Sequence, residues 1–202
     1  MKFTCLIIFV CLFVTACSEK LQLPLLGSDA IILAFGDSIT HGTGAKMDQS
    51  YPAVLEKLSG RKVINAGIPG EESEQGLQRL PGLLEKHRPA LLILCHGGND
   101  ILHKKDMKKM ESNLREMIRQ AQAQNIPVVM LGVPQFGIFL STAPVYQEIA
   151  GSTGVVFIKD LISDLLKDNS LKSDTVHPNG DGYQKIAETI YAVLLEAGAF
   201  KK

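Results

Sequence analysis

Five short stretches of the chain are rich in apolar residues, and longer amphipathic stretches separate them. A strand that is covered on both faces carries apolar side chains throughout, whereas a half-exposed strand alternates apolar and polar ones. The five stretches therefore predict buried strands of a parallel sheet. They are Ile31–Phe35, Lys62–Asn65, Ala90–His96, Pro127–Gly132 and Val155–Lys159.

Helical patterns fill the longer intervals between these stretches. In residues 106–125 the apolar side chains recur every three or four positions, which is the spacing of one helix face. Similar patterns in residues 73–87 and 182–198 predict two further helices. The side chains expected to face the core are Leu77, Leu80, Leu84, Met107, Met110, Leu114, Met117, Ile118, Ala121, Tyr183, Ile186, Ala187, Ile190 and Leu194.

Strands that alternate with helices imply right-handed crossover connections. The expected fold class is therefore α/β, a three-layer α/β/α sandwich around a five-stranded parallel sheet. In such a sheet ligands bind outside the carboxyl ends of the strands. The residues that directly follow each apolar stretch are thus the first place to look for chemistry.

The first residues of the chain have the pattern of an export signal. Lys2 precedes an apolar stretch at 4–14 that is too short for a membrane span. The small residues directly before Cys17 resemble the lipobox of bacterial lipoproteins, a family in which the chain is cut before the cysteine and the thiol is lipidated. An ordinary secretory signal is the alternative.

These features divide the chain into three expected parts: a signal peptide at 1–16, a lipidated Cys17 with a tether to residue 30, and one folded domain at 31–198. The resemblance implies a lipid anchor in the cell envelope of a Gram-negative bacterium. Because Ser18 rather than an aspartate follows the cysteine, the outer membrane, facing the periplasm, is favoured.

Charge and cysteine content narrow the classes of partner. The chain of 202 residues has 21 Lys and Arg and 21 Asp and Glu. A near-neutral domain lacks the basic face of a nucleic-acid-binding protein, so we expect no such partner. We also expect a monomer. Of the four cysteines, only Cys95 would remain as an unmodified thiol. It cannot form a disulfide framework, and we expect it to be a small buried hydrophobe.

Four polar segments follow predicted strands or precede the last predicted helix. Gly36-Asp37-Ser38 ends the first strand, "GIPGEES" follows the second, "GGND" follows the third, and "DTVHP" stands before the final helix. Together they supply a hydroxyl, an imidazole, carboxylates, a carboxamide and glycine amides. Those are the groups that acyl transfer requires.

Each group has a candidate role in such a reaction. The hydroxyl of Ser38 is a weak nucleophile until a base removes its proton, and His177 is the best available base. Asp174 can hold the other ring nitrogen if a turn brings it back. The Ser38 amide, a glycine amide of the second loop and the Asn99 side chain are candidate donors to an oxyanion. Each segment alone could also be a turn, so the hypothesis depends on their order and placement.

In that order the segments resemble the motif blocks of the GDSL or SGNH hydrolases, from about residue 32 to residue 195. Within this family the chain is most similar to the periplasmic thioesterase I, lysophospholipase and arylesterase group. The resemblance implies a flavodoxin-like sheet. It also implies Ser38 as nucleophile, His177 as base and Asp174 as its partner, with an oxyanion hole formed by Ser38, Gly70 and Asn99.

At three places the blocks leave a choice open or depart from the family pattern. Gly67 and Gly70 both stand in the second loop, and we favour Gly70, which precedes an acidic residue, as the donor. Ile39 replaces the leucine of the family name. Glu71 stands where the group often has aspartate, a change that alters a loop hydrogen bond without removing the donor.

Other polar side chains near the blocks are expected to be structural. Asp37 and Asp100 flank the candidate site and should accept N–H groups of the loops. His41, His96 and His103 lie nearby but show no metal-ligand spacing. We therefore expect neither a metal nor a cofactor.

The resulting expectation is a hydrolase of carboxylic esters or thioesters that works through an acyl-Ser38 intermediate. The segment 133–146 either covers the acyl group of a small-molecule substrate or packs on the core. The alternatives are a deacetylase of cell-envelope sugars and a non-catalytic binding lipoprotein. The apolar side chains of the segment are Phe136, Ile138, Phe139, Leu140 and Tyr146.

Overall fold

The computed structural model describes residues 21–135 and 140–201. A five-stranded sheet lies at its centre, in the order β2-β1-β3-β4-β7, and each neighbouring pair of strands is parallel. This architecture confirms the expected fold class, and every predicted stretch overlaps one strand. The strands are β1 (Ile31–Gly36), β2 (Lys62–Gly67), β3 (Leu91–Cys95), β4 (Val128–Leu131) and β7 (Val156–Ile158).

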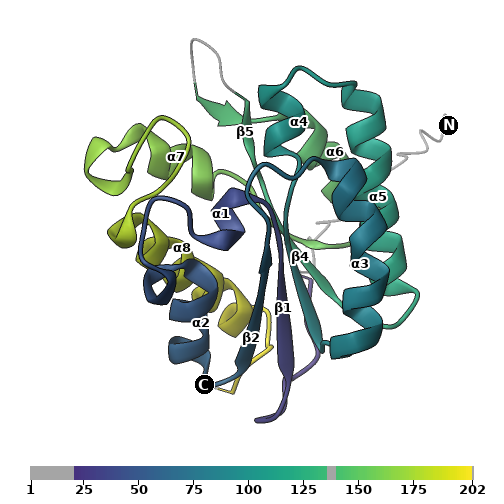
Figure 1. Ribbon diagram of the computed structural model, residues 1–202. Coiled ribbons are helices and arrows are strands. Elements are labelled where there is room, and N and C mark those ends of the chain that lie inside the picture. The colour runs from purple at the N-terminus through teal and green to yellow at the C-terminus, as the bar shows by residue number, and fades with distance from the viewer. Residues whose placement is uncertain (1–20, 136–139, 202) are drawn as a thin grey trace, which may run out of the picture.

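Helices cover both faces of the sheet and produce three layers (Figure 1). One face carries α1 (Ser38–His41), α2 (Tyr51–Ser59), α7 (Leu161–Lys167) and α8 (Gly180–Glu196). The other face carries α3 (Ser73–His87), α4 (Gly98–Leu102), α5 (Met107–Gln122) and α6 (Pro144–Thr153). The remaining elements are the 3₁₀ turns η1 (Met47–Gln49) and η2 (Asn169–Leu171) and the antiparallel pair β5 (Pro134–Gln135) and β6 (Ser141–Thr142).

The strand order reverses between β1 and β3. The chain passes from β1 outward to β2 and then returns to the far side of β1 for β3. The loops that leave β1 and β3 therefore diverge at the carboxyl edge. Such a switch point is where open α/β sheets leave a crevice for a ligand.

The predicted core residues are buried, with two exceptions. The apolar stripes of α5 and α8 and the side chains of β1, β3 and β4 lie between the layers. Met107 is 39% exposed, because α5 begins with this residue at the surface, so its assignment to the core is wrong. Leu77 on α3 packs against the core but stays partly exposed.

The packed domain is longer than the sequence pattern indicates. The N–H of Leu23 donates to the carbonyl of Ala197, and that of Leu26 to Ala199, at 2.8 and 2.9 Å. Leu26 and Phe200 are both buried. The second half of the predicted tether is therefore part of the fold, because it pairs with the chain after α8.

The predicted signal peptide and lipidated cysteine lie outside the described residues. None of the helices in residues 21–135 and 140–201 combines the length and apolar character needed to cross a membrane.

Candidate active site

Loops from five parts of the chain meet at the carboxyl edge of the sheet and line a cavity of about 280 Å³. Ser38 comes from the loop after β1, Gly70 from the loop after β2, and Asn99 from the start of α4 after β3. Val133 follows β4, and His177 precedes α8. The switch point thus gathers residues that are far apart in the sequence.

Ser38, His177 and Asp174 form a continuous chain of hydrogen bonds. Nε2 of His177 lies 2.9 Å from Oγ of Ser38, and Nδ1 lies 2.8 Å from Oδ2 of Asp174. An ionised carboxylate can only accept, so Nδ1 carries the ring proton and Nε2 accepts from the serine hydroxyl. The structure therefore brings together the three residues that were predicted as nucleophile, base and partner.

A tight turn holds Asp174 against His177. Oδ1 of Asp174 accepts the backbone N–H groups of Val176 and His177, both at 2.8 Å. Burial raises the pKa of the Asp174 carboxyl, but hydrogen bonds from the His177 ring and the two amides outweigh it, and the pKa lies below its ordinary value. The carboxylate therefore stays ionised at neutral pH.

The two flanking aspartates have the structural contacts expected of them. Asp37 caps α1 by accepting the N–H of Ile39 at 3.1 Å, and burial raises the pKa of its carboxyl. Asp100 accepts both the N–H and the hydroxyl of Ser73, at 2.8 and 2.6 Å. These bonds tie the ends of β1 and β3 to the neighbouring helices.

The second-block glycine lies in a turn from Ile68 to Glu71, which the N–H of Glu71 closes by donating to the Ile68 carbonyl at 3.2 Å. Gly70 has φ of 78°, and Pro69 precedes it, as a type II turn favours. Among the described residues no hydrogen bond uses the N–H of Gly70. That donor remains available beside the cavity.

Asn99 lines the cavity, whereas Gly67 does not. Nδ2 of Asn99 donates to the Glu71 carbonyl at 3.0 Å. Since an amide nitrogen has two N–H groups, the second is left for a group in the cavity. Gly67 instead ends β2 against α1, where a Cβ would lie 2.1 Å from the backbone nitrogen of His41. The structure brings Gly70 and Asn99 to the cavity with Ser38 and places Gly67 outside it.

Sequence reasoning did not single out Arg79 and did not connect His96, expected to be structural, with Glu71. Arg79 on α3 and His96 after β3 both bind the carboxylate of Glu71. The acid after Gly70 was the signal, but no spacing pattern connects it with positions 79 and 96. Within residues 21–135 and 140–201, no group of three or more His, Cys, Asp or Glu side chains could hold a metal.

The described residues of the apolar segment 133–146 divide between the cavity and the core. Val133 and Pro134 line the cavity. Tyr146 lies in the core, with its hydroxyl donating to the His96 carbonyl at 2.7 Å, so for this residue the second alternative, packing on the core, holds. Leu140 packs against the core, and Phe136, Ile138 and Phe139 lie outside the described residues.

Cys95 confirms the expectation for the lone thiol. Its side chain is fully buried at the end of β3, and burial raises the pKa of the thiol well above its ordinary value.

Known proteins resemble this chain along most of its length. A model of the GDSL-like lipase/acylhydrolase family matches residues 34–185. The thioesterase 1/protease 1/lysophospholipase L1 of Escherichia coli strain K12 is 30% identical over 78% of this chain and 79% of its own. The arylesterase of Vibrio mimicus is 30% identical over 95% of this chain and 96% of its own.

Solved structures share the fold. The crystal structure of TesA is 26% identical, with a TM-score of 0.74 over 83% of this chain and 99% of that one. The psychrotrophic esterase EstA from Pseudoalteromonas, inhibited by monoethylphosphonate, is 24% identical with a TM-score of 0.72, over 83% of this chain and 98% of that one.

Proposed function

The chain belongs to the GDSL-like lipase/acylhydrolase family, and from that premise we propose that it hydrolyses carboxylic esters or thioesters through an acyl-Ser38 intermediate. The hydrogen bond of 2.9 Å between Ser38 Oγ and His177 Nε2 is the observation that supports this most directly. A serine hydroxyl becomes a competent nucleophile when a positioned base takes its proton.

In the first step Ser38 Oγ attacks the carbonyl carbon of the substrate while its proton passes to His177 Nε2. The ring is then an imidazolium, and the ionised Asp174 at 2.8 Å from Nδ1 stabilises its charge. The tetrahedral intermediate collapses when His177 returns the proton to the leaving alcohol or thiol. The acyl group remains on Ser38 as an ester.

The negative charge of the tetrahedral intermediate falls on the former carbonyl oxygen. Three donors border the cavity where this oxygen would sit: the amides of Ser38 and Gly70 and the side-chain amide of Asn99. Donors that are already oriented toward developing charge need no rearrangement during the reaction. We assign these three groups to the oxyanion hole.

The second step repeats the first with water as the nucleophile. His177 removes a proton from the water, which attacks the acyl carbon, and the acid leaves when the proton returns to Ser38 Oγ. The acid is released and the hydroxyl is restored, so no external oxidant, reductant or cofactor enters the cycle.

Cavity size and composition indicate the substrate class. The wall beside Ser38 is apolar, with Val133, Pro134, Leu102 and Val176. A volume of about 280 Å³ lies at the lower limit of ligand pockets, which run from about 300 to 1,000 Å³. The relatives are named thioesterase, lysophospholipase and arylesterase. From the size of the cavity we expect short acyl or aryl groups to be preferred over long acyl chains.

The test is hydrolysis of p-nitrophenyl esters of increasing chain length by the parent and by Ser38→Ala. We expect the variant to fold and to lose several decades of kcat, because it lacks the nucleophile. A fluorophosphonate should add its mass to the parent at Ser38 and leave the variant unlabelled. Retention of more than about a tenth of the parental rate would refute the assignment.

We also infer that the protein is anchored in the cell envelope by lipid on Cys17. The small residues before Cys17 and the apolar stretch at 4–14 support this inference. Stable attachment depends on acyl chains, so Cys17→Ser should move the protein from the membrane fraction to the soluble fraction. An unchanged membrane fraction, with no lipid mass on the parent, would contradict it.

A further inference from the structure

Glu71 follows the oxyanion-hole glycine and is almost completely buried, although it is a carboxylate. Buried charges are costly unless they are paired and hydrogen-bonded. Arg79 and His96 supply the pairing. Nε of Arg79 lies 2.8 Å from Oε1 of Glu71, and Nη2 of Arg79 donates to Oε2. Nε2 of His96 lies 3.1 Å from the same Oε2. Both oxygens of the carboxylate thus accept hydrogen bonds, from Arg79 on α3 and from His96 after β3.

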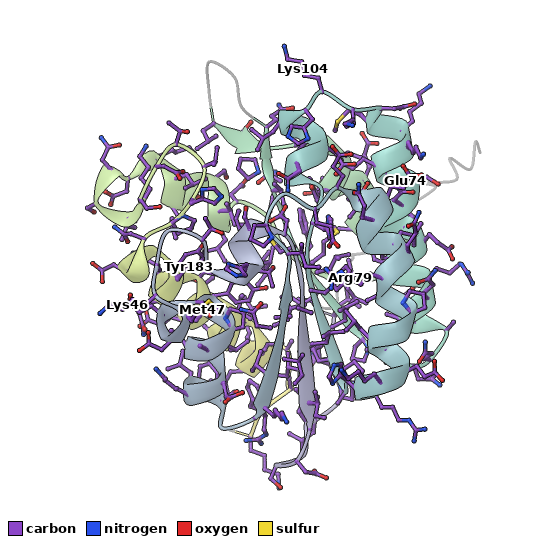
Figure 2. All side chains as sticks on the ribbon, in the orientation of Figure 1. Lys46, Met47, Glu74, Arg79, Lys104 and Tyr183 are labelled. Atoms are coloured by element: carbon purple, nitrogen blue, oxygen red, sulfur yellow. The ribbon has the colours of Figure 1, made fainter. Side chains whose placement is uncertain are left out.

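Arg79 connects Glu71 to the sheet. Nη2 of Arg79 also donates to the carbonyl of Ala66 at 3.0 Å, and the guanidinium lies 4.3 Å from the centre of the Phe35 ring. Figure 2 shows Arg79 between α3 and the sheet. Because Ala66 is in β2 and Phe35 in β1, the arginine joins the loop to both strands that lead to the cavity.

His96 holds the same carboxylate from the other side. Nδ1 of His96 accepts the N–H of Gly97 at 2.9 Å, so the ring proton is on Nε2 and is donated to Glu71. Gly76 on α3 leaves room for the ring, because a Cβ there would lie 2.3 Å from Nε2. The imidazole is fully buried, and its two ring nitrogens bind Glu71 and Gly97 rather than Ser38.

The backbone of Glu71 contacts two of the three oxyanion donors. Its N–H closes the turn that presents Gly70, and its carbonyl accepts one N–H of Asn99 at 3.0 Å. A shift of Glu71 would therefore move the Gly70 amide and the Asn99 amide together. The carboxylate is the part of the residue that Arg79 and His96 hold still.

We propose that Glu71 is a positioning residue for the oxyanion hole, held by Arg79 on one side and His96 on the other. This inference rests on the proposed function. Donors to an oxyanion act at about 2.7–3.1 Å, and a misplacement of 1 Å can cost about 10²-fold in rate. Glu71 touches neither substrate nor nucleophile and acts through the two donors.

The direct test is Glu71→Gln, which keeps the shape of the side chain but replaces one acceptor oxygen with a donor. We expect kcat to fall about tenfold while KM changes less than about twofold, because the donors act on charge that appears in the transition state. Glu72→Gln is the matched control. Glu72 pairs with His103 and Lys105 and makes no bond to an oxyanion donor, so its kcat should stay parental.

A double-mutant cycle separates positioning from a general loss of stability. In the Asn99→Ala background one of the two donors held by Glu71 is already absent, so Glu71→Gln should then cost about threefold rather than about tenfold. An equal loss of kcat in both backgrounds would overturn the proposal. So would a parental kcat for the single variant Glu71→Gln.

Arg79→Lys provides a second route if Glu71→Gln does not fold. A lysine cannot bind Glu71 with two parallel bonds and reach Ala66 at once, so kcat should again fall at nearly constant KM. Arg119→Lys is the control, since Arg119 makes the same two-bond pair with Glu116 on the surface.

Two outcomes distinguish this inference from the proposed function. If neither Glu71→Gln nor Arg79→Lys folds, Glu71 is a structural residue and the inference is wrong. If Ser38→Ala keeps its activity, the proposed function is wrong instead.

Discussion

Replacing Asn99 with alanine removes two hydrogen-bond donors that serve different purposes. One N–H of the side chain binds the Glu71 carbonyl at 3.0 Å in the folded protein. The other is left for an oxygen in the cavity that Asn99 lines. The first donor contributes to stability, whereas the second contributes only when charge develops on the substrate. One variant therefore has two separate expected effects.

The catalytic effect follows from the second donor. Loss of a single oxyanion donor costs about 3–4 kcal/mol of transition-state stabilisation, or about 10²–10³ in kcat. KM should change little, because the ground-state carbonyl carries only a small part of the charge. The amides of Ser38 and Gly70 remain, so activity above the uncatalysed rate should persist.

The stability effect follows from the first donor. Asn99 is 9% exposed, so the Glu71 carbonyl loses its partner in a buried environment. An unsatisfied buried group costs about 1–3 kcal/mol. For a domain of this size each kcal/mol lowers Tm by about 2–4 °C, so we expect a fall of between about 2 and 12 °C.

Steady-state hydrolysis of p-nitrophenyl butyrate and thermal unfolding by circular dichroism measure the two effects on the same preparation. The catalytic measurement is made well below the reduced Tm, so that all of the variant is folded. A kcat within about threefold of the parent, together with a lower Tm, would refute the catalytic role. Asn99 would then be a structural residue of the turn, and only backbone donors would remain for the oxyanion.

Three further variants, and the pH dependence of Glu71→Gln, test other parts of the structure. Asp174→Asn should lower kcat by roughly 10³–10⁴ with little change in Tm, because His177 loses the acceptor that fixes its tautomer; a loss below tenfold contradicts this. Leu26→Ala should lower the free energy of unfolding in urea by about 2–3 kcal/mol, and no change would mean that this segment is not part of the core. Gly67→Ala should lower Tm by several degrees, since the new Cβ would meet the backbone nitrogen of His41. Burial raises the pKa of the Glu71 carboxyl, but hydrogen bonds from His96 and Arg79 outweigh it and hold the pKa below its ordinary value. The contribution of the carboxylate to stability is therefore full above that ordinary value and is lost as pH falls through the lowered pKa, so the Tm difference between the parent and Glu71→Gln should shrink in acid; a constant difference would contradict this.

The inner strands of the sheet, β1, β3 and β4, were predictable because they are apolar on both faces, whereas β2 at the edge is only partly buried. The stretch from Leu91 to Cys95 has no polar residue, and only a strand between two helical layers tolerates that pattern. The helices α1 and α4 were not predicted as helices. They have only four and five residues, which is too short for a periodic pattern. The pairing of Leu23 and Leu26 with the end of the chain depends on contacts between distant residues, which periodicity does not report.

The residues of the candidate site that stand in short local motifs were predictable. Ser38, Asn99 and His177 each stand in a short block whose position after a strand or before a helix indicates the cavity. The residues that hold the blocks in place carry no such signal. Arg79 stands in an amphipathic helix among other charged residues, and His96 in an apolar stretch. Only the fold shows that both reach Glu71.

The hydrogen bond between Ser38 and His177 joins positions 139 residues apart. During synthesis at about 5–20 residues per second, Ser38 therefore precedes its base by roughly 7–28 s. Throughout that interval the growing chain carries a serine hydroxyl with ordinary, low reactivity. In the proposed mechanism, any product that ends before residue 177 lacks the base, however well its first strands have formed. The order of residues along the chain would then delay hydrolysis until almost the whole protein has been made.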